Sequence, residues 1–339
     1  MSTAYAPVPD RPIRWGLLAA GDIAHAMART VARVGGGEVV AVAARDADRA
    51  RAFAAEHGIP RAFGSYAELC ADPEVDVVYI SSTHPHHAAQ ALDCLDAGKH
   101  VLVEKPLALT VRDTERVLDR ARARGLFAME AMWTRCLPVV RELTARVAGG
   151  DIGRLRSFSA AFTVPFGYDE KHRLFDLENG GGALMDIGIY PVTLAHLLAG
   201  HPTDVQVLGT TVPTGADDQV AVQWHSDSGV LVQVVCDSQS HGGSRTVLRG
   251  TRGWIEVHGP VNDPESFTVH RTGEDEEHVT GERRGFEHEV EEVHRCLREG
   301  LVESALVPHE DTVAIMTVLE SIRRELGVRY PQEQEPLRT

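Results

Sequence analysis

Short apolar runs alternate with helix-like segments through the first 130 residues, and no other feature of the chain constrains its fold as strongly. The strand-like runs span residues 13–18, 39–44, 75–80, 100–103 and 126–130. The helix-like segments between them span residues 23–34, 47–57, 88–97 and 111–124. Continuous apolar strands joined by helices are typical of a parallel sheet covered on both faces. The alternation therefore predicts an α/β protein whose first domain, residues 1–130, is a doubly wound parallel sheet.

The pattern changes after residue 130, and a chain of 339 residues is long enough for two domains. The expected elements are a helix at 138–148, a strand at 155–164, an apolar helix at 183–198 and two closing helices at 287–299 and 310–326. Between residues 205 and 270, strand-like runs follow one another without long helices, which favours antiparallel pairing. We predict a C-terminal α+β domain over residues 131–339 with a mostly antiparallel, open-faced sheet. We expect the last helix to pack back on the first domain.

Charge is distributed unevenly along the chain. Residues 1–125 carry 15 basic and 16 acidic side chains, whereas the remainder carries 19 basic and 33 acidic ones. Because the second half is so acidic, nucleic acid and anionic membranes are disfavoured as its partners. The nearly neutral first half is the better place for a phosphorylated ligand.

Cysteine usage and the amino terminus bear on the cellular compartment. The five cysteines are scattered, without a C-x-x-C pair, which indicates reduced thiols. The first ten residues lack a signal-sequence pattern, and we find no apolar run approaching the ~20 residues of a membrane span. We therefore expect a cytoplasmic protein.

A nucleotide-binding loop is predicted where the first strand meets the first helix. Dinucleotide-binding domains place G-x-G-x-x-G/A there, and the three positions fall here at Ala19, Gly21 and Ala24. The first glycine is replaced, but the strand–turn–helix context fits. The start of the helix, at Asp22 and Ile23, would offer free N–H groups to a pyrophosphate. A tight turn in a domain that binds another ligand is the alternative.

The ends of the second and third predicted strands add to this site. An NAD site usually has an acidic residue at the end of the second strand, but Ala44 stands there and Arg45 follows. An arginine suits a 2′-phosphate, so we predict NADP as the preferred cofactor, with NAD possible. The next strand is followed by Ser82, Thr83, His84, Pro85, His86 and His87. We interpret these histidines as a loop that lines the cofactor or caps a helix, rather than as a metal site.

Lysine is rare in this chain. Only Lys99, Lys105 and Lys171 occur among 34 basic residues, and Lys105 stands in Glu104-Lys105-Pro106, directly after a buried strand. A lysine can be tuned by burial and neighbouring charge, unlike an arginine. Lys105 is therefore a candidate catalytic group; a lysine that merely ends a strand is the alternative.

These motifs occur in the order seen in the glucose–fructose oxidoreductase/inositol dehydrogenase (Gfo/Idh/MocA) family, and the resemblance covers essentially the whole chain. Within that family the chain most resembles the dimeric dihydrodiol dehydrogenases, which also act as NADP-dependent D-xylose dehydrogenases. The closer similarity lies in residues 39–46, 129–135, 180–190, 294–300 and 327–332. Asp22 departs from many relatives, with an effect that we cannot assign.

The resemblance implies roles for individual residues. Lys105 would be the active-site lysine, Tyr190 the proton-transferring group and Asp186 the acidic residue one helical turn before it. Lys105 would then lower the pKa of the Tyr190 phenol, so that the tyrosine exchanges the hydroxyl proton while nicotinamide exchanges the hydride. A buried tyrosine with a purely structural hydrogen bond is the alternative.

The cofactor and substrate contacts follow from the same resemblance. The cofactor-binding residues would be Ala19, Gly21, Asp22, Ile23, Ala44, Arg45, Ser82, Thr83, His84, Pro85, His87, Glu104, Lys105 and Pro106. The substrate-binding residues would be Trp133, Arg135, Phe162, Asp186 and Tyr190. Core packing of Trp133 and a surface ion pair of Arg135 are the alternatives for those two.

We therefore expect an NADP-dependent oxidoreductase that acts on a secondary alcohol, carbonyl or anomeric carbon of a sugar, polyol or cyclic trans-diol. A glycosidase or lyase with transient redox chemistry, and a non-catalytic cofactor-sensing regulator, are the alternatives. Relatives associate through the second domain's sheet, so a homodimer or homotetramer is expected.

Overall fold

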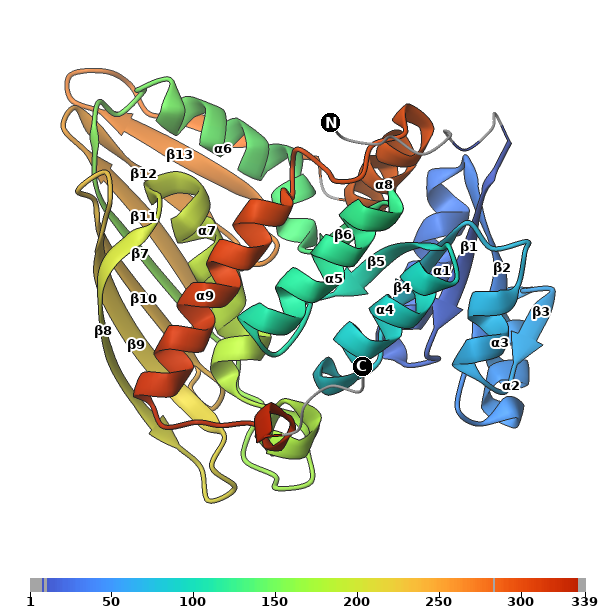
Figure 1. The fold of residues 1–339 in the computed structure, drawn as a ribbon. Helices are drawn as coiled ribbons and strands as arrows, with labels where there is room; N and C mark the ends of the chain where they lie inside the picture. The colour runs from blue at the N-terminus through green and yellow to red at the C-terminus, as the bar shows by residue number, and fades with distance from the viewer. Residues whose placement is uncertain (1–7, 9–10, 283, 335–339) are drawn as a thin grey trace. The chain divides into compact units, whose positions relative to one another are not determined.

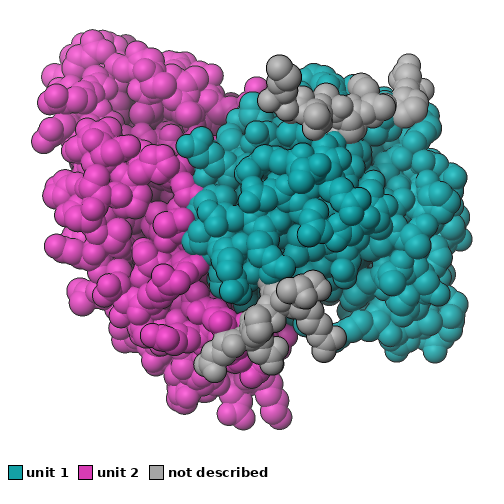
Figure 2. Space-filling view, in the orientation of Figure 1, with its two compact units in different colours: residues 1–133, 284–313, 339 teal, residues 134–283, 314–338 magenta. Residues whose placement is uncertain are grey.

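Residue 8 and residues 11–282 and 284–334 are described by the computed structural model. Their contacts divide the chain into two units, shown in different colours in Figure 2. The first contains residues 1–133 and 284–313, and the second contains residues 134–283 and 314–338. Apart from Val8, the first ten residues, where we looked for a signal sequence, lie outside the described residues.

The grouping differs from the predicted domain limits in one segment. Residues 284–313 lie with the first unit, whereas the sequence analysis assigned everything after residue 130 to the second domain. The reason is α8 (Glu287–Glu299), whose apolar face packs against α1 (Asp22–Val34). The last helix, α9 (His309–Glu325), is divided between the two units after residue 313.

The first unit is built on a parallel sheet of six strands, which confirms the predicted fold class. Its strands are β1 (Ile13–Leu18), β2 (Gly37–Ala43), β3 (Arg61–Phe63), β4 (Val77–Ile80), β5 (His100–Glu104) and β6 (Ala128–Ala131). The order across the sheet is β3-β2-β1-β4-β5-β6. The sequence analysis did not predict β3 or the helix α3 (Tyr66–Ala71), because runs of three and six residues carry too little periodicity.

The helices of this unit begin and end at the residues that the sequence favours. They include α2 (Ala47–His57), α4 (His87–Asp96), α5 (Val111–Arg124) and the short η1 (His84–His86). The Asp46 carboxylate accepts hydrogen bonds from the first N–H groups of α2, and Gly58 ends that helix in the left-handed conformation. In Figure 1, α4 and α5 lie side by side on one face of the sheet. Apolar side chains of β1, β4 and β5 form a core with α3, α4 and α5.

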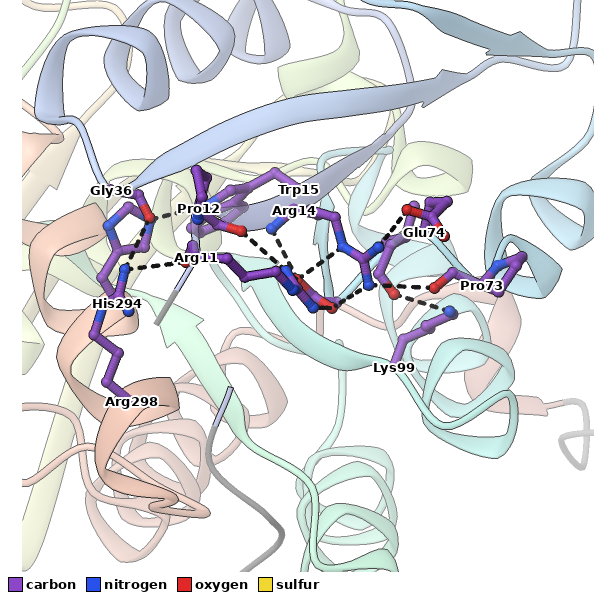
Figure 3. Close-up of polar contacts among 12 residues, drawn as sticks. Arg11, Pro12, Arg14, Trp15, Gly36, Pro73, Glu74, Lys99, His294 and Arg298 are labelled. Carbon is purple, nitrogen blue, oxygen red and sulfur yellow. Dashed lines mark hydrogen bonds and ion pairs between the residues drawn. The ribbon is translucent and has the colours of Figure 1, made fainter. Parts of the chain in front are cut away.

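Polar contacts attach α8 to the beginning of β1 (Figure 3). The Trp15 indole N–H donates to His294 Nε2 over 3.0 Å, and the Arg298 guanidinium donates to the Gly36 carbonyl over 3.3 Å. Trp15 is fully buried and His294 is nearly so. These contacts explain why a helix from late in the chain belongs to the first unit.

A second polar cluster in Figure 3 holds the N-terminal end of β1. The guanidinium groups of Arg11 and Arg14 both donate to the Asp76 carboxylate and hold its pKa well below the usual range. Nearby, the Lys99 ammonium group donates to the carbonyls of Asp72 and Val75. Lys99 therefore has a structural role, which distinguishes it from Lys105.

The second unit contains an eight-stranded sheet in the order β14-β13-β12-β11-β7-β10-β9-β8. Its strands are β7 (Leu155–Thr163), β8 (Pro202–Thr211), β9 (Asp217–Ser226), β10 (Leu231–Asp237), β11 (Ser244–Gly250), β12 (Gly253–His258), β13 (Ser266–Arg271) and β14 (Glu277–Thr280). All neighbouring strands are antiparallel except β7 and β10, as predicted for a mostly antiparallel sheet. Burial alternates along β9 and β10, so one face of the sheet is open.

Helices cover the other face of this sheet. α7 (Ile189–Ala199) contacts β7 and β10, and α6 (Pro138–Ala148) packs against α7 and β13 (Figure 1). Short helical turns connect the larger elements: η2 (Trp133–Cys136), η3 (Arg173–Phe175), η4 (Leu177–Asn179), η5 (Leu184–Gly188) and η6 (Pro331–Gln334).

One segment is long and apolar enough to span a membrane, although the sequence analysis expected no such segment. By length and composition, Leu177–Ala199 could cross a bilayer. Its most apolar 18-residue stretch is 89% buried inside the protein, as core helices of soluble proteins are. The segment is therefore weak evidence of a membrane span.

Acid should destabilise the first unit through His294. Burial, with Arg298 nearby, lowers the pKa of His294 to about 4, so the folded state resists a proton that the unfolded chain accepts near pH 6.5. Its stabilising contribution is therefore complete above pH 6.5 and lost as the pH falls towards 4, by up to about 3 kcal/mol. His294→Gln, which can still accept from Trp15, should lose less stability over this range. Urea unfolding at several pH values measures both proteins, and equal losses would contradict the assignment.

Candidate active site

The register of the first sheet brings four loops to one edge. Leu18 is the direct neighbour of Ala43 on one side and of Ile80 on the other, and Ile80 pairs with Val103. The loops after β1, β2, β4 and β5 therefore begin at the same level. All predicted cofactor residues lie at this edge: Ala19, Gly21, Asp22, Ile23, Ala44, Arg45, Ser82, Thr83, His84, Pro85, His87, Glu104, Lys105 and Pro106.

The loop after β1 has the geometry that a pyrophosphate needs. Ala19 adopts a positive φ of 84°, a region usually left to glycine, and its N–H donates to the Ala43 carbonyl. Gly21 precedes α1 and gives it no side-chain cap. A Cβ at Gly21 would meet nothing within 4 Å, so a phosphate group can approach the backbone there. The loop fits a dinucleotide although its first glycine is missing.

Two arginines follow the end of β2. Arg45 is exposed directly after Ala44. One helical turn later, Arg49 donates from Nε and Nη2 to the Ala20 carbonyl, over 3.1 and 2.8 Å. Arg49 thus braces the phosphate loop, a contact that the sequence analysis missed. With no carboxylate at residue 44, these two guanidinium groups suit a 2′-phosphate better than a ribose hydroxyl.

The histidines after β4 are not arranged as metal ligands. His87 is fully buried, with Nδ1 2.8 Å from the Pro106 carbonyl oxygen and Nε2 3.0 Å from that of Ser82. Burial lowers its pKa, and a neutral ring can donate to only one of these carbonyls at a time. Its ring therefore links the loop after β4 to the loop after β5.

Three carboxyl groups come together next to Lys105 in the sequence and the fold, two of them buried. Glu104 accepts from the Tyr79 hydroxyl and from the Lys105 N–H, and Glu130 accepts from the Leu107 N–H over 2.9 Å. The third member, Glu289 on α8, is 1% exposed. Burial and its two acidic neighbours raise the pKa of Glu289 well above the usual range, which favours the neutral form of this carboxyl group. Sequence analysis missed Glu289, because only the fold brings α8 to this place.

The second unit groups three of the predicted substrate residues. The rings of Phe162 on β7 and Tyr190 on α7 lie edge to face, with centroids 6.1 Å apart. Both are at least nine-tenths buried. Asp186 is 5% exposed, and Arg173 Nη2 lies 3.2 Å from each of its carboxylate oxygens. Arg173, half exposed, was missed by the sequence analysis because η3 precedes the glycine run without an obvious motif.

The helix that carries Asp186 and Tyr190 starts differently from the prediction. We predicted an α-helix over residues 183–198, but η5 (Leu184–Gly188) is a π-helical turn. π-turns often mark functional sites, because they rotate the following side chains relative to a regular helix. The predicted α-helix is therefore wrong over residues 184–188, whereas Tyr190 lies in α7 as predicted.

A buried carboxylate anchors this turn. Asp217 Oδ2 accepts from the Leu184 N–H over 2.6 Å, and burial raises the pKa of Asp217 to about 6. Gly182, with φ of 132°, passes directly beside it. Near the end of the chain, the Tyr330 hydroxyl donates to the Gly181 carbonyl over 3.0 Å. The glycine run is thus fixed by contacts from two distant segments.

The two remaining substrate candidates are both buried. Trp133, in the first unit, packs edge to face on Phe286 with ring centroids 4.9 Å apart. Arg135, in the second unit, is 5% exposed, which excludes the surface ion pair considered for it. Their contact with substrate remains a prediction.

Comparison with known proteins agrees with this geometry. Residues 13–132 match the family model described as an oxidoreductase family with an NAD-binding Rossmann fold. Residues 140–256 match the GFO/IDH/MocA C-terminal domain. The chain is 36% identical over 337 residues to trans-1,2-dihydrobenzene-1,2-diol dehydrogenase of Bos taurus, covering 95% of this chain and 99% of that protein.

The chain belongs to the Gfo/Idh/MocA family of oxidoreductases. The human enzyme of the same name is also 36% identical, over 338 residues, with 95% of this chain and 99% of that protein covered. Among solved structures, KijD10, a 3-ketoreductase from Actinomadura kijaniata in complex with NADP and TDP-benzene, matches with a TM-score of 0.82 at 27% identity. That match covers 93% of this chain and 98% of KijD10. The family membership confirms the resemblance inferred from the sequence.

Gly182 should tolerate no side chain in this Gfo/Idh/MocA protein. A Cβ there would lie 2.3 Å from Asp217 Oδ1, and φ of 132° is almost restricted to glycine. Gly182→Ala should lower the free energy of unfolding by about 3 kcal/mol. Gly243→Ala, also at positive φ but with nothing within 4 Å of its Cβ, is the matched control, at about 1 kcal/mol. Thermal unfolding compares them, and equal losses would refute the steric argument.

Proposed function

We propose that this protein is an NADP-dependent oxidoreductase that transfers hydride between nicotinamide and a CH–OH or carbonyl group of a sugar, polyol or cyclic trans-diol. The observation that carries the proposal is the position of Lys105. It follows β5 at the sheet edge that also bears the open phosphate loop at Gly21 and the guanidinium groups of Arg45 and Arg49. In an open α/β sheet, ligands bind at this edge.

We propose Tyr190 as the group that exchanges the hydroxyl proton. Nicotinamide, when bound, supplies or accepts the hydride. The phenol of Tyr190 is nearly buried, so its hydroxyl can meet a substrate with little competition from water. The ammonium group of Lys105 would stabilise the phenolate as the proton leaves. Asp186, held by Arg173, would orient the substrate hydroxyls.

Relatives suggest the class of substrate. The mammalian relatives are named for the oxidation of a cyclic trans-diol, and KijD10 is a 3-ketoreductase. The first name describes a ring whose hydroxyl group is oxidised, and the second describes a carbonyl group that is reduced. The Phe162 and Tyr190 rings suit the apolar face of such a ring, and the Asp186–Arg173 pair suits its hydroxyl groups. We propose a cyclic polyol or sugar as the substrate of this chain.

We further propose a cytoplasmic homodimer or homotetramer formed through the open sheet face. Leu208, Ala221 and Val235 are direct neighbours across β8, β9 and β10, and Leu208 is 77% exposed. Leu231 and Trp254 are further apolar side chains of this sheet with substantial exposure. Such apolar residues on a regular sheet are typical of a surface that another subunit covers.

Tyr190→Phe tests the proposed function. Aldoses, inositols, keto-sugars and trans-dihydrodiols are screened with NADP and NAD by the near-ultraviolet absorbance of reduced nicotinamide. With the best substrate, the variant should lose about 10²–10⁴-fold in kcat, because it cannot transfer the proton, and should bind NADP as before.

Tyr168→Phe is the matched control, since Tyr168 is 42% exposed and its substitution should leave kcat unchanged. Full activity of Tyr190→Phe would refute the role of Tyr190. No turnover of any substrate, with tight NADP binding retained, would favour a cofactor-sensing protein instead.

A further inference from the structure

Three potential metal ligands converge outside the proposed active site. His25 lies in the first turn of α1, and Glu56 and His57 lie in the last turn of α2. His25 Nδ1 lies 2.7 Å from His57 Nε2 and 3.3 Å from Glu56 Oε1, and the last two atoms lie 3.6 Å apart. Among the described residues of the chain, this is the group whose histidine, cysteine and carboxylate ligand atoms come together in this way.

The triangle has the size that a tetrahedral metal ion requires. Zinc binds imidazole nitrogen and carboxylate oxygen at about 2.0–2.2 Å, which places neighbouring ligand atoms about 3.4 Å apart. The three observed separations scatter around this value, so an ion can bind all three atoms after a small opening of the His25–His57 pair. A histidine pair with one carboxylate is a common zinc ligand set.

Packing already orients the two imidazole rings. Phe53 lies against both, with its ring centroid 4.3 Å from that of His25 and 4.7 Å from that of His57. The His57 side chain is 11% exposed, whereas the Glu56 side chain is 59% exposed. The site is therefore held by the protein on one side and open on the other, where water can complete the coordination.

Two charged groups next to the site act on a bound cation in opposite directions. Glu56 supplies negative charge. Arg29, one turn after His25 on α1, is the opposing charge and limits the affinity.

We propose that His25, Glu56 and His57 bind one divalent transition-metal ion, with zinc as the best fit. The ion would join the start of α1, directly after the phosphate loop, to the end of α2. The site uses no residue of the proposed hydride-transfer chemistry. The metal proposal can therefore be correct or wrong whether or not the proposed function is correct. Sequence analysis predicted no metal, because it weighed only the histidines that are adjacent in sequence.

Zinc titration of the full chain, without an affinity tag, tests the proposal. Calorimetry should find one zinc ion per chain, and zinc should raise the thermal unfolding temperature. His57→Ala should weaken binding more than about tenfold and abolish the thermal shift, and Glu56→Gln, which leaves both rings in place, should weaken it less.

His241→Ala is the matched control, because His241 is exposed in the second unit; it should bind zinc like the unchanged protein. Cobalt(II) provides a further readout, since a tetrahedral site gives intense visible absorption that His57→Ala should remove. Absence of zinc binding by the unchanged protein would overturn the proposal. Binding that survives in both His57→Ala and Glu56→Gln would equally overturn it, because the ion would then lie elsewhere.

Discussion

The register between parallel strands is the constraint on which the rest of the first unit depends. Because Leu18, Ala43, Ile80 and Val103 stand at one level across four strands, every loop that follows them opens at the same edge. A shift of register would separate the phosphate loop from Lys105 and from Glu104 at the end of β5. The buried polar contacts of His87 and Arg49 then fix the loops to one another. The sheet positions the loops, and the few side chains at its edge supply the groups for the proposed chemistry.

Each unit buries an ionisable group near a residue proposed for the chemistry. Glu289 lies beside Glu104 and Glu130 in the first, and Asp217 anchors the π-turn before Tyr190 in the second. Such groups destabilise a core unless they are neutral or hydrogen-bonded. Their presence at these two places is typical of proteins that trade stability for a fixed active site.

Much of the architecture was predictable from the sequence, because the strands of a doubly wound sheet are continuous apolar runs and its helices carry clear capping residues such as Asp46. The very short β3 and α3 were missed for want of periodicity, and the π-turn at η5 because its pattern does not differ from that of an α-helix. Arg49, Arg173 and Glu289 act through tertiary contacts, so no local motif revealed them. A metal site was considered and rejected at His84, His86 and His87, where histidines are close in sequence, whereas the proposed ligands lie on two helices that are apart in the sequence.

The central claim is that the cation of Lys105 assists proton transfer by Tyr190. The pH dependence of kcat/KM in the direction of alcohol oxidation tests it most directly, in the unchanged protein and in Lys105→Met at high enzyme concentration. If Lys105 stabilises the phenolate as proposed, the residual activity of Lys105→Met should rise with pH only at values about one unit or more higher. Profiles that coincide in position, whatever their height, would contradict the account.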